Sequence, residues 1–557
     1  MTQAHPTGAR ALVDALLTHG ADTAYCVPGE SYLAVLDALY DVRDRLKLVV
    51  CRQEGGAAYM ADAYGKLTGK PGICFVTRGP GATNAAVGVH TAFQDSAPMI
   101  LFIGQVGRGM LEREAFQEID YRRMYGQMAK WVAQIDDASR IPEFVSRAFH
   151  IATSGRPGPV VLALPEDMQH EPCTVAQPQP YRRVMPSPAQ ADMAELRSRL
   201  AAAQRPLMIL GGRGWNDAAC ADIRRFAEAW QLPVACAFRY QDLFDNTHPL
   251  YAGDVGLGIN PKLAARVREA DLVLAVGPRL GESTTSGYAL FDIPRPKQTL
   301  VHVHAGIDEL GRVYAADLPI NAGYPEFAAA ARELLPPASL NWVGSAETAR
   351  ADYLAWTEPP ATPGELQMGE VMRWLRERLP ADAILTNGAG NYAIWLHRFY
   401  RYRQFGTQLA PTNGSMGYGV PSAVAAKIAQ PARIVVSFSG DGCFMMNGQE
   451  FATAVKYGAA VVFVVVNNSM YGTIRMHQER EFPDRVSGTE LANPDFAALA
   501  RAYGALGEVV TRTDEFAPTF ERALADGGPS LIELRTNPEV ITPSATITQI
   551  KGQSKRR

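Results

Sequence analysis

Short apolar runs rich in β-branched residues recur along the whole chain and alternate with segments of helical pattern. Most of these runs are apolar at consecutive positions, which is typical of strands that are buried on both faces of a sheet. Strands that alternate with helices build parallel sheets from βαβ units. The sequence therefore predicts an α/β protein with strands at residues 23–27, 46–51, 72–77, 99–105, 159–164, 206–210, 233–238, 272–276, 299–304, 383–386, 433–438, 460–466 and 530–534.

Two proline-rich stretches interrupt this alternation, at residues 172–188 and 336–363, and each contains five prolines. Proline runs without hydrophobic periodicity are typical of linkers between domains. We therefore expect three doubly wound parallel-sheet domains at residues 1–171, 189–336 and 364–545, each of ordinary domain size.

Composition narrows the class of protein. The 557 residues carry a net charge of −3, so no field across the whole chain attracts nucleic acid or an anionic membrane. The longest apolar run, residues 459–466, is far shorter than the ~20 residues of a membrane-spanning helix, and the N-terminus lacks a secretory pattern. The seven cysteines form no C-x-x-C pair, which favours free thiols. We expect a cytoplasmic enzyme that binds neither nucleic acid nor membrane.

The last third of the chain contains a motif in two parts. The strand at 433–438 leads into Gly440-Asp441-Gly442, and the strand at 460–466 leads into Asn467-Asn468, with a helical pattern at 447–457 between them. Glycines allow the backbone to approach a phosphate closely, and Asp441 and Asn468 offer the oxygen ligands that Mg²⁺ prefers. The alternative is two ordinary turns, one capped by Asp441. The pairing of both parts within 29 residues favours a diphosphate–metal site at the carboxyl ends of adjacent strands.

These segments resemble the cofactor-binding motif of thiamine-diphosphate-dependent enzymes. In the similar segment Asn413–Pro421, Met416 takes the place of the apolar residue that wedges under the cofactor; core filling is the alternative for a single Met. The resemblance also implies that the Met470 carbonyl is the third metal ligand beside Asp441 and Asn468. The implied cofactor contacts of this third of the chain are Gly388, Ala389, Gly390, Asn391, Tyr392, Gly414, Met416, Gly440, Asp441, Gly442, Cys443, Asn468, Met470, Gly472, Thr473 and Ile474.

The first third of the chain supplies a candidate catalytic acid, Glu54. Thiamine chemistry requires a carboxylate that shares a proton with ring nitrogen N1′ of the cofactor, and the protein contributes its position and electrostatics. Glu54 follows the strand at 46–51 and opens a helix of small residues; taken alone, it is also a common type of first-turn carboxylate. Pro28, Gly29, Pro80 and Asn84 are the further cofactor contacts expected here.

The segments Thr77–Asn84, Ile103–Val106, Phe116–Glu118 and Gly155–Val160 closely resemble the N-terminal domain of acetohydroxyacid (acetolactate) synthases. The resemblance implies that the first domain binds the pyrimidine, the central domain is Rossmann-like and the third binds the diphosphate. It further implies a homodimer or homotetramer whose active site combines Glu54 of one subunit with Asp441 and Asn468 of another. Phe93, Gln94, Gln105 and Lys130 are expected to line the substrate pocket, although Lys130 is also a candidate for a solvated surface residue.

The sequence departs from this branch in two places. The stretches that contact a structural flavin in the branch are altered here, at Gly253–Gly256 and Arg279–Ser283, and Gly211–Gly214 is a weak nucleotide signal that also fits a plain turn. These changes argue against bound FAD and predict a colourless protein. In the substrate pocket, His477 replaces a Trp and Glu30 adds a carboxylate, which argues against dedicated branched-chain biosynthesis.

The resulting hypothesis is an acetolactate-synthase-like enzyme that uses thiamine diphosphate and Mg²⁺ to decarboxylate a 2-oxo acid and to join the remaining fragment to a second carbonyl compound. A non-biosynthetic 2-oxo-acid decarboxylase, an oxidase, or an acyl-CoA or other C–C lyase of the same superfamily is the alternative. A non-catalytic binding protein on the same fold is a more remote alternative, because Glu54, Asp441 and Asn468 are all present.

Overall fold

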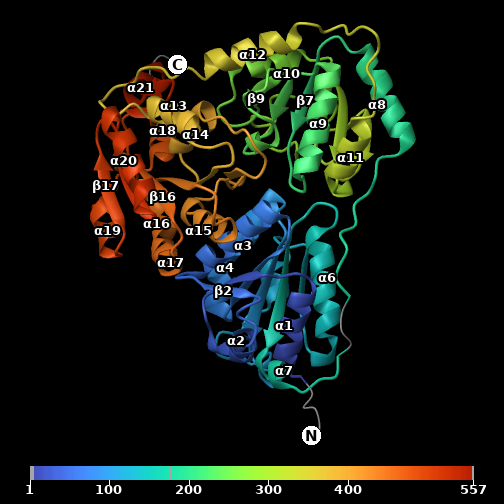
Figure 1. The fold of residues 1–557 in the computed structure, drawn as a ribbon, viewed down its shortest axis with the longest axis vertical. Helices are drawn as coiled ribbons and strands as arrows, with labels where there is room; N and C mark the ends of the chain where they lie inside the picture. The colour runs from blue at the N-terminus through green and yellow to red at the C-terminus, as the bar shows by residue number, and fades with distance from the viewer. Residues whose placement is uncertain (1–5, 176–178, 555–557) are drawn as a thin grey trace. The chain divides into compact units, whose positions relative to one another are not determined.

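The structure is a computed structural model that describes residues 6–175 and 179–554; residues 1–5 and 555–557 at the two ends, and 176–178 in the first predicted linker, lie outside the described residues. The described residues form three six-stranded sheets and one two-stranded ribbon. Neighbouring strands in all three large sheets run parallel, and helices flank them (Figure 1). The predicted α/β class is confirmed, and each sheet has a hydrophobic core of its own.

The first sheet has the strand order β2-β1-β3-β4-β6-β5. Its strands are β1 (Thr23–Cys26), β2 (Lys47–Val50), β3 (Gly72–Val76), β4 (Met99–Gln105), β5 (Trp131–Gln134) and β6 (Pro159–Pro165). Its helices are α1 (Gly8–Thr18), α2 (Leu33–Tyr40), α3 (Glu54–Thr68), α4 (Gly79–Asp95), α5 (Tyr121–Tyr125), α6 (Ile141–Thr153) and α7 (Glu166–His170).

Helices α3 and α4 pack tightly because small residues face each other, and a Cβ added at Gly88 would clash with Ala58. A buried ion pair adds to this contact. Lys66 on α3 lies 2.8 Å from Asp62 on the same helix and also pairs with Asp95 on α4. The side chains of all three are buried, so the pairing fixes how the two helices sit.

The third sheet repeats the topology of the first. Its order is β14-β13-β15-β16-β18-β17, which is the order of the first sheet when the strands are counted from β13. Its strands are β13 (Ile384–Asn387), β14 (Gln408–Leu409), β15 (Val435–Gly440), β16 (Val461–Asn467), β17 (Leu506–Val510) and β18 (Ser530–Arg535). Its helices are α13 (Met368–Arg378), α14 (Tyr392–Phe399), α15 (Gly419–Ala429), α16 (Asp441–Asn447), α17 (Phe451–Tyr457), α18 (Gly472–Glu481), α19 (Phe496–Ala502) and α20 (Thr513–Asp526). The ribbon of β19 (Val540–Thr542) and β20 (Ala545–Thr546) and helix α21 (Ile547–Ser554) follow.

The second sheet has the order β12-β11-β10-β7-β8-β9, which is the strand order of a Rossmann fold. Its strands are β7 (Pro206–Leu210), β8 (Val234–Cys236), β9 (Tyr251–Asp254), β10 (Leu272–Val276), β11 (Thr299–His304) and β12 (Leu318–Asn321). Its helices are α8 (Gln190–Ala202), α9 (Asp217–Trp230), α10 (Pro261–Glu269), α11 (Tyr324–Ala331) and α12 (Ser345–Trp356).

Two of the segments interpreted in the sequence have a different structure from the one predicted. The predicted linker at 336–363 contains helix α12, because its prolines all lie outside Ser345–Trp356 and the helix buries Ala349 and Tyr353. The helix predicted at 447–457 is preceded by α16, which begins at Asp441 itself. Asp441 is therefore the first residue of a helix and not part of a separate turn.

By their contacts the described residues divide into two compact units. One unit contains the chain up to Val184, which includes the first sheet, together with residues 424–429 and 447–457. The other unit contains the second and third sheets. The three domain boundaries given above stay a prediction.

Two further findings concern the whole described chain. Among the described residues, no helix is both long and apolar enough to cross a membrane. All seven cysteines are free, and all except Cys220 are buried. Burial raises the pKa of the Cys26 thiol to about 12, so this side chain stays protonated at neutral pH.

Asp254, at the end of β9, predicts how stability depends on pH. Burial raises the pKa of its carboxyl to about 7, against an ordinary 3.8. The folded chain therefore binds a proton that the unfolded chain releases, so the stability contributed is full below about pH 4 and is lost as the pH rises through about 7. Asp254→Asn cannot ionise, and its melting temperature should gain on that of the wild type between pH 5 and pH 8. Equal pH slopes in thermal unfolding scans of the two proteins would contradict the assignment.

Candidate active site

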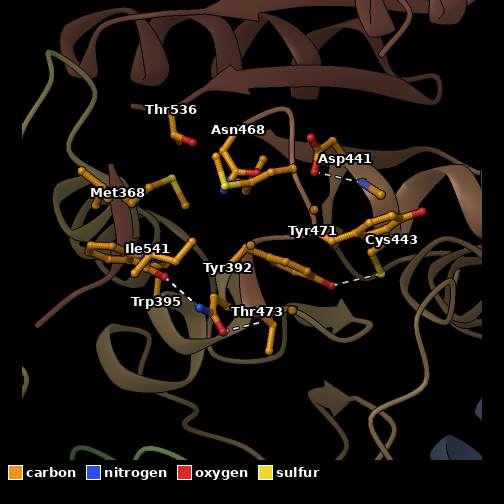
Figure 2. A pocket seen from close by; sticks show the side chains of 18 of the residues that line it. Met368, Tyr392, Trp395, Asp441, Cys443, Asn468, Tyr471, Thr473, Thr536 and Ile541 are labelled. Atoms are coloured by element: carbon orange, nitrogen blue, oxygen red, sulfur yellow. Dashed lines mark hydrogen bonds between the residues drawn. The ribbon is translucent and has the colours of Figure 1, made fainter. Parts of the chain in front are cut away.

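A candidate binding site lies where two adjacent strands of the third sheet end. Strands β15 and β16 run parallel, and Gly440 pairs with Val466, so Asp441 and Asn468 follow their carboxyl ends. A cavity of about 260 Å³ opens at this edge, and Figure 2 shows Asp441 and Asn468 among its lining side chains. The lining also includes Ala389, Gly390, Asn391, Tyr392, Gly414, Met416, Gly440, Gly442, Cys443, Met470, Gly472, Thr473 and Ile474, all of which the sequence predicts as cofactor contacts.

Glycines at this edge of the sheet allow the backbone to lie close to neighbouring side chains. A Cβ at Gly388 would lie 2.5 Å from Cys443 Sγ, and a Cβ at Gly442 would lie 2.6 Å from the ring of Tyr471. The amide of Gly388 donates to the Tyr392 hydroxyl at 2.9 Å, and the Gly417 amide donates to Cys443 Sγ at 3.2 Å. No larger residue fits at Gly388 or Gly442, so the backbone lies directly against Cys443 and Tyr471, which both line the cavity.

Asn391 ties three segments together around the cavity. Its amide oxygen accepts a hydrogen bond from Thr473 Oγ1 at 2.9 Å, and its amide nitrogen donates to the Ile541 carbonyl at 3.1 Å (Figure 2). Ile541 lines the cavity, as do Met368 and Trp395, so one wall is apolar. The sequence analysis did not single out these apolar residues, because buried apolar side chains have no distinguishing pattern.

Asp441 is held in place by two hydrogen bonds. The Gly442 amide donates to its Oδ1 at 2.9 Å, and Asn493 Nδ2 donates to its Oδ2 at 2.8 Å. Burial raises the pKa of Asp441, and these hydrogen bonds oppose that rise. Asn493 also donates to Asn467 Oδ1 at 3.0 Å. The sequence analysis missed Asn493, which lies in a loop after α18 and belongs to no recognisable motif.

The charge of the cavity bears on what it can hold. Among its lining residues, all of which the structure describes, Asp441 is the one charged side chain. The side-chain amide of Asn468 makes no hydrogen bond with any part of the chain that the structure describes. Its oxygen is therefore available to a ligand. A diphosphate beside Asp441 needs a cation to neutralise it, and a carboxylate with an amide oxygen suits Mg²⁺, which keeps phosphate and water oxygens as further ligands. The residues present therefore fit a diphosphate bound with Mg²⁺.

Glu54 lies in the other compact unit, as the first residue of α3. Its Oε2 accepts a hydrogen bond from Asn84 Nδ2 on α4 at 2.9 Å, and its Oε1 has no hydrogen bond from the described residues. A Cβ at Gly81 would lie 3.4 Å from Oε1, so the start of α4 stays close to the carboxyl. Pro80, also predicted as a contact, is in this first turn of α4.

The predicted residues that follow β1 lie at the same carboxyl edge of the first sheet. Pro28 and Gly29 come directly after β1, and Glu30 opens a short 3-10 helix, Glu30–Tyr32. Glu30 Oε1 lies 3.4 Å from Arg78 Nη2, so this carboxylate is paired with a buried guanidinium. The sequence analysis did not anticipate that pairing.

Gln105, at the end of β4, is buried and both ends of its amide are used. Its nitrogen donates to the Ile119 carbonyl at 3.0 Å, and its oxygen accepts from the Val106 amide at 3.0 Å. The side chain therefore shapes the loop between residues 106 and 119. His477 is exposed on α18, in the other unit.

The other predicted pocket residues lie at the opposite edge of the first sheet. Lys130 precedes β5, and its amine donates to the Ile151 and Ser154 carbonyls at the end of α6. Phe93 is near the end of α4, with the Arg156 guanidinium carbon 5.1 Å from its ring centre, and Gln94 is its neighbour in sequence. Within this unit none of the three is beside Glu54, and their place in a substrate pocket stays a prediction.

Comparison with known proteins supplies the family. Three models match: the N-terminal TPP binding domain, the central domain and the C-terminal TPP binding domain of thiamine pyrophosphate enzymes, at residues 6–124, 193–331 and 388–534. The chain belongs to the thiamine pyrophosphate enzymes. Glu54 lies in the first matched region, and Asp441 and Asn468 lie in the third.

Individual relatives place the chain in the acetolactate-synthase-like branch of the thiamine pyrophosphate enzymes. It is 34% identical to an acetolactate synthase large subunit of Parasynechococcus marenigrum, over 95% of this chain and 87% of the relative. It is 30% identical to the acetolactate synthase isozyme 2 large subunit of Escherichia coli, over 95% of each. An acetolactate synthase of Mycobacterium bovis is 32% identical over 93% of this chain and 86% of the relative.

Asn493 provides a test of the metal end of the site. Asn493→Ala removes the hydrogen bond that orients Asp441, and loss of such outer partners typically weakens metal binding by about 10–100-fold. Calorimetric titration with Mg²⁺ in the presence of thiamine diphosphate should show a loss of this order. Asn341→Ala, which removes a hydrogen bond to the Ala203 carbonyl in the central domain, is the control. An unchanged Mg²⁺ affinity in Asn493→Ala would remove Asn493 from the site.

Proposed function

We propose that this enzyme uses thiamine diphosphate and Mg²⁺ to decarboxylate a 2-oxo acid and to join the remaining fragment to a second carbonyl compound, as an acetolactate-synthase-like enzyme. The observation that carries the proposal is the glycine-lined cavity at the ends of β15 and β16, in which Asp441 is the one charged lining residue. The names of the relatives, acetolactate synthases of several organisms, support the same reaction.

Each end of the site has its own task in this proposal. Asp441, Asn468 and the Met470 carbonyl would hold Mg²⁺, and the glycine-rich segments Gly388–Gly390 and Gly440–Gly442 would lie against the diphosphate. Met416 lines the cavity together with Gly414 and would contact the cofactor there. When bound, thiamine diphosphate supplies the nucleophile and the electron sink for decarboxylation.

Glu54 handles the proton in this proposal. Its Oε2 is occupied by Asn84, which leaves Oε1 to share a proton with pyrimidine nitrogen N1′. Asn84 thereby fixes which oxygen faces the cofactor, and general acid–base catalysis of this kind contributes about 10²–10⁴-fold. Glu30, paired with Arg78 at the same edge, is a further candidate for contact with the substrate.

The assembly follows from this division of tasks. We propose that residues 1–171 bind the pyrimidine, 189–336 form a central domain and 364–545 bind the diphosphate. The active site would combine Glu54 of one subunit with Asp441 and Asn468 of its partner, in a homodimer or homotetramer in the cytoplasm. The proposed enzyme has no bound flavin. In the branch that the sequence resembles, two stretches contact flavin, and the acidic residues Asp254 and Glu282 lie in the corresponding stretches of this chain.

Product analysis tests the proposal. The purified chain, supplied with thiamine diphosphate, Mg²⁺ and pyruvate, should release CO₂ and form acetolactate. Acetaldehyde would instead identify a simple decarboxylase, and acetate an oxidase. A panel of 2-oxo acids, each with and without an aldehyde acceptor, extends the test to other donors. Absence of CO₂ release from every donor would overturn the proposal.

Glu54→Gln tests the assigned acid. The amide cannot share the N1′ proton, so turnover should fall about 100-fold or more, while thiamine diphosphate still binds with Mg²⁺ in calorimetry. Glu143→Gln changes an exposed glutamate on α6 in the same unit and serves as the matched control. Near-wild-type turnover of Glu54→Gln would contradict the role of Glu54.

A further inference from the structure

Glu450 is a fully buried carboxylate that none of the roles above explains. It ends the 3-10 helix Gly448–Glu450, directly before α17, in the segment 447–457 that packs in the same compact unit as the first sheet. Burying a carboxylate is costly unless hydrogen bonds replace its lost water. The hydrogen-bond partners of Glu450 therefore indicate which part of the structure this buried carboxylate stabilises.

Those partners are the two backbone amides directly before α3. Glu450 Oε1 accepts hydrogen bonds from the Arg52 amide at 3.0 Å and the Gln53 amide at 2.9 Å. Its Oε2 accepts from Thr453 Oγ1 at 2.6 Å. Arg52 and Gln53 immediately precede Glu54, so the Glu450 carboxylate binds the backbone directly before the candidate catalytic acid.

A second interaction stabilises the same backbone within the first turn of α3. The Gln53 side chain caps the helix by accepting from the Gly56 amide at 3.1 Å. A negative charge beside a helix N-terminus is also favourable, because the first amides of the helix have no partner within it. Glu450 and the Gln53 side chain together fix the direction in which the chain enters α3.

Close packing leaves this arrangement little freedom. A Cβ at Gly56 would lie 2.5 Å from Glu450 Oε1, so the helix backbone stands directly against the carboxylate. At the other end of the segment, the Tyr457 hydroxyl accepts from the Val50 amide at 2.8 Å, on β2. The segment 447–457 thus anchors both the strand that precedes Glu54 and the start of the helix that carries it.

We propose that Glu450 is a positioning residue, whose carboxylate holds the Arg52 and Gln53 amides so that Glu54 is presented correctly to the cofactor. The inference rests on the proposed function of Glu54 and deepens it. Its physical basis is that a displacement of about 1 Å in a catalytic group can cost on the order of 100-fold in rate. The segment that positions the acid is also the one that joins the two parts of the metal motif, Asp441 and Asn468.

Two substitutions at Glu450 separate positioning from bulk stability. Glu450→Ala removes the acceptor for both amides, and kcat should fall at least tenfold with KM changed less than threefold. Glu450→Gln keeps a carbonyl oxygen for both amides, and its nitrogen can donate to Thr453, so it should retain most of kcat. Glu309→Ala, which removes another buried glutamate in the central domain, is the control for destabilisation and should leave kcat within about twofold.

Hydrogen–deuterium exchange at the Arg52 and Gln53 amides gives a readout that needs no turnover. Without cofactor, exchange should be slow in the wild type and in Glu450→Gln and at least tenfold faster in Glu450→Ala. Unchanged kcat in Glu450→Ala, equal losses in the Gln and Ala variants, or unchanged exchange would overturn the inference. If the wild type releases no CO₂ from any 2-oxo acid, the proposed function fails, and the exchange data still decide whether Glu450 holds these amides.

Discussion

The need to balance the charge of a diphosphate governs the site in the third sheet. The cavity is lined by several glycines and one carboxylate, and no lysine, arginine or histidine is among its lining residues, all of which the structure describes. In the proposed function, a metal cation shared by Asp441, Asn468 and the phosphates would balance this charge. Narrow glycine turns at the strand ends, the Asn493 hydrogen bond and the network around Asn391 all serve that arrangement.

The chain uses one strand order twice for two different tasks. The first and third sheets share the same topology, and in each the candidate functional residues follow the carboxyl ends of strands: Glu54 follows the edge strand β2, and Asp441 and Asn468 follow the inner strands β15 and β16. The third sheet carries the candidate metal ligands Asp441 and Asn468, and the first carries Glu54. Parallel sheets favour this because strand ends and helix starts meet at a single edge. In each half, the polar groups that orient the key side chain come from a different segment of the chain, such as Asn84 for Glu54.

How far the sequence predicts the fold depends on burial. It predicts thirteen of the eighteen strands in the large sheets, and the other five, β5, β9, β12, β14 and β17, are all at sheet edges. An edge strand is only partly covered, so its apolar pattern is weaker, as in β17 with its sequence Leu-Gly-Glu-Val-Val. Helix α12 was not predicted because the prolines on either side of it dominate the composition of the segment 336–363.

The candidate site shows the same limit. Glu54, Asp441 and Asn468 are predictable because each follows a strong strand in a segment with recognisable neighbours. Asn493 and Glu450 lie in segments without a motif, and only the folded backbone brings them to Asp441 and to the Arg52 and Gln53 amides. Lys130 shows the same limit, since nothing in the sequence indicates that its amine donates to the Ile151 and Ser154 carbonyls at the end of α6.

The central claim is that one working site needs two chains, with the acid from one and the metal ligands from the other. Mixing two inactive variants, Glu54→Gln and Asp441→Ala, under conditions that exchange subunits tests it directly. With shared sites, each mixed dimer has one intact site and one doubly defective site. An equal mixture should then regain about a quarter of wild-type turnover, because half of the dimers are mixed. If each site belongs to one chain, every site carries a defect, and a mixture that stays inactive despite verified subunit exchange would contradict the account.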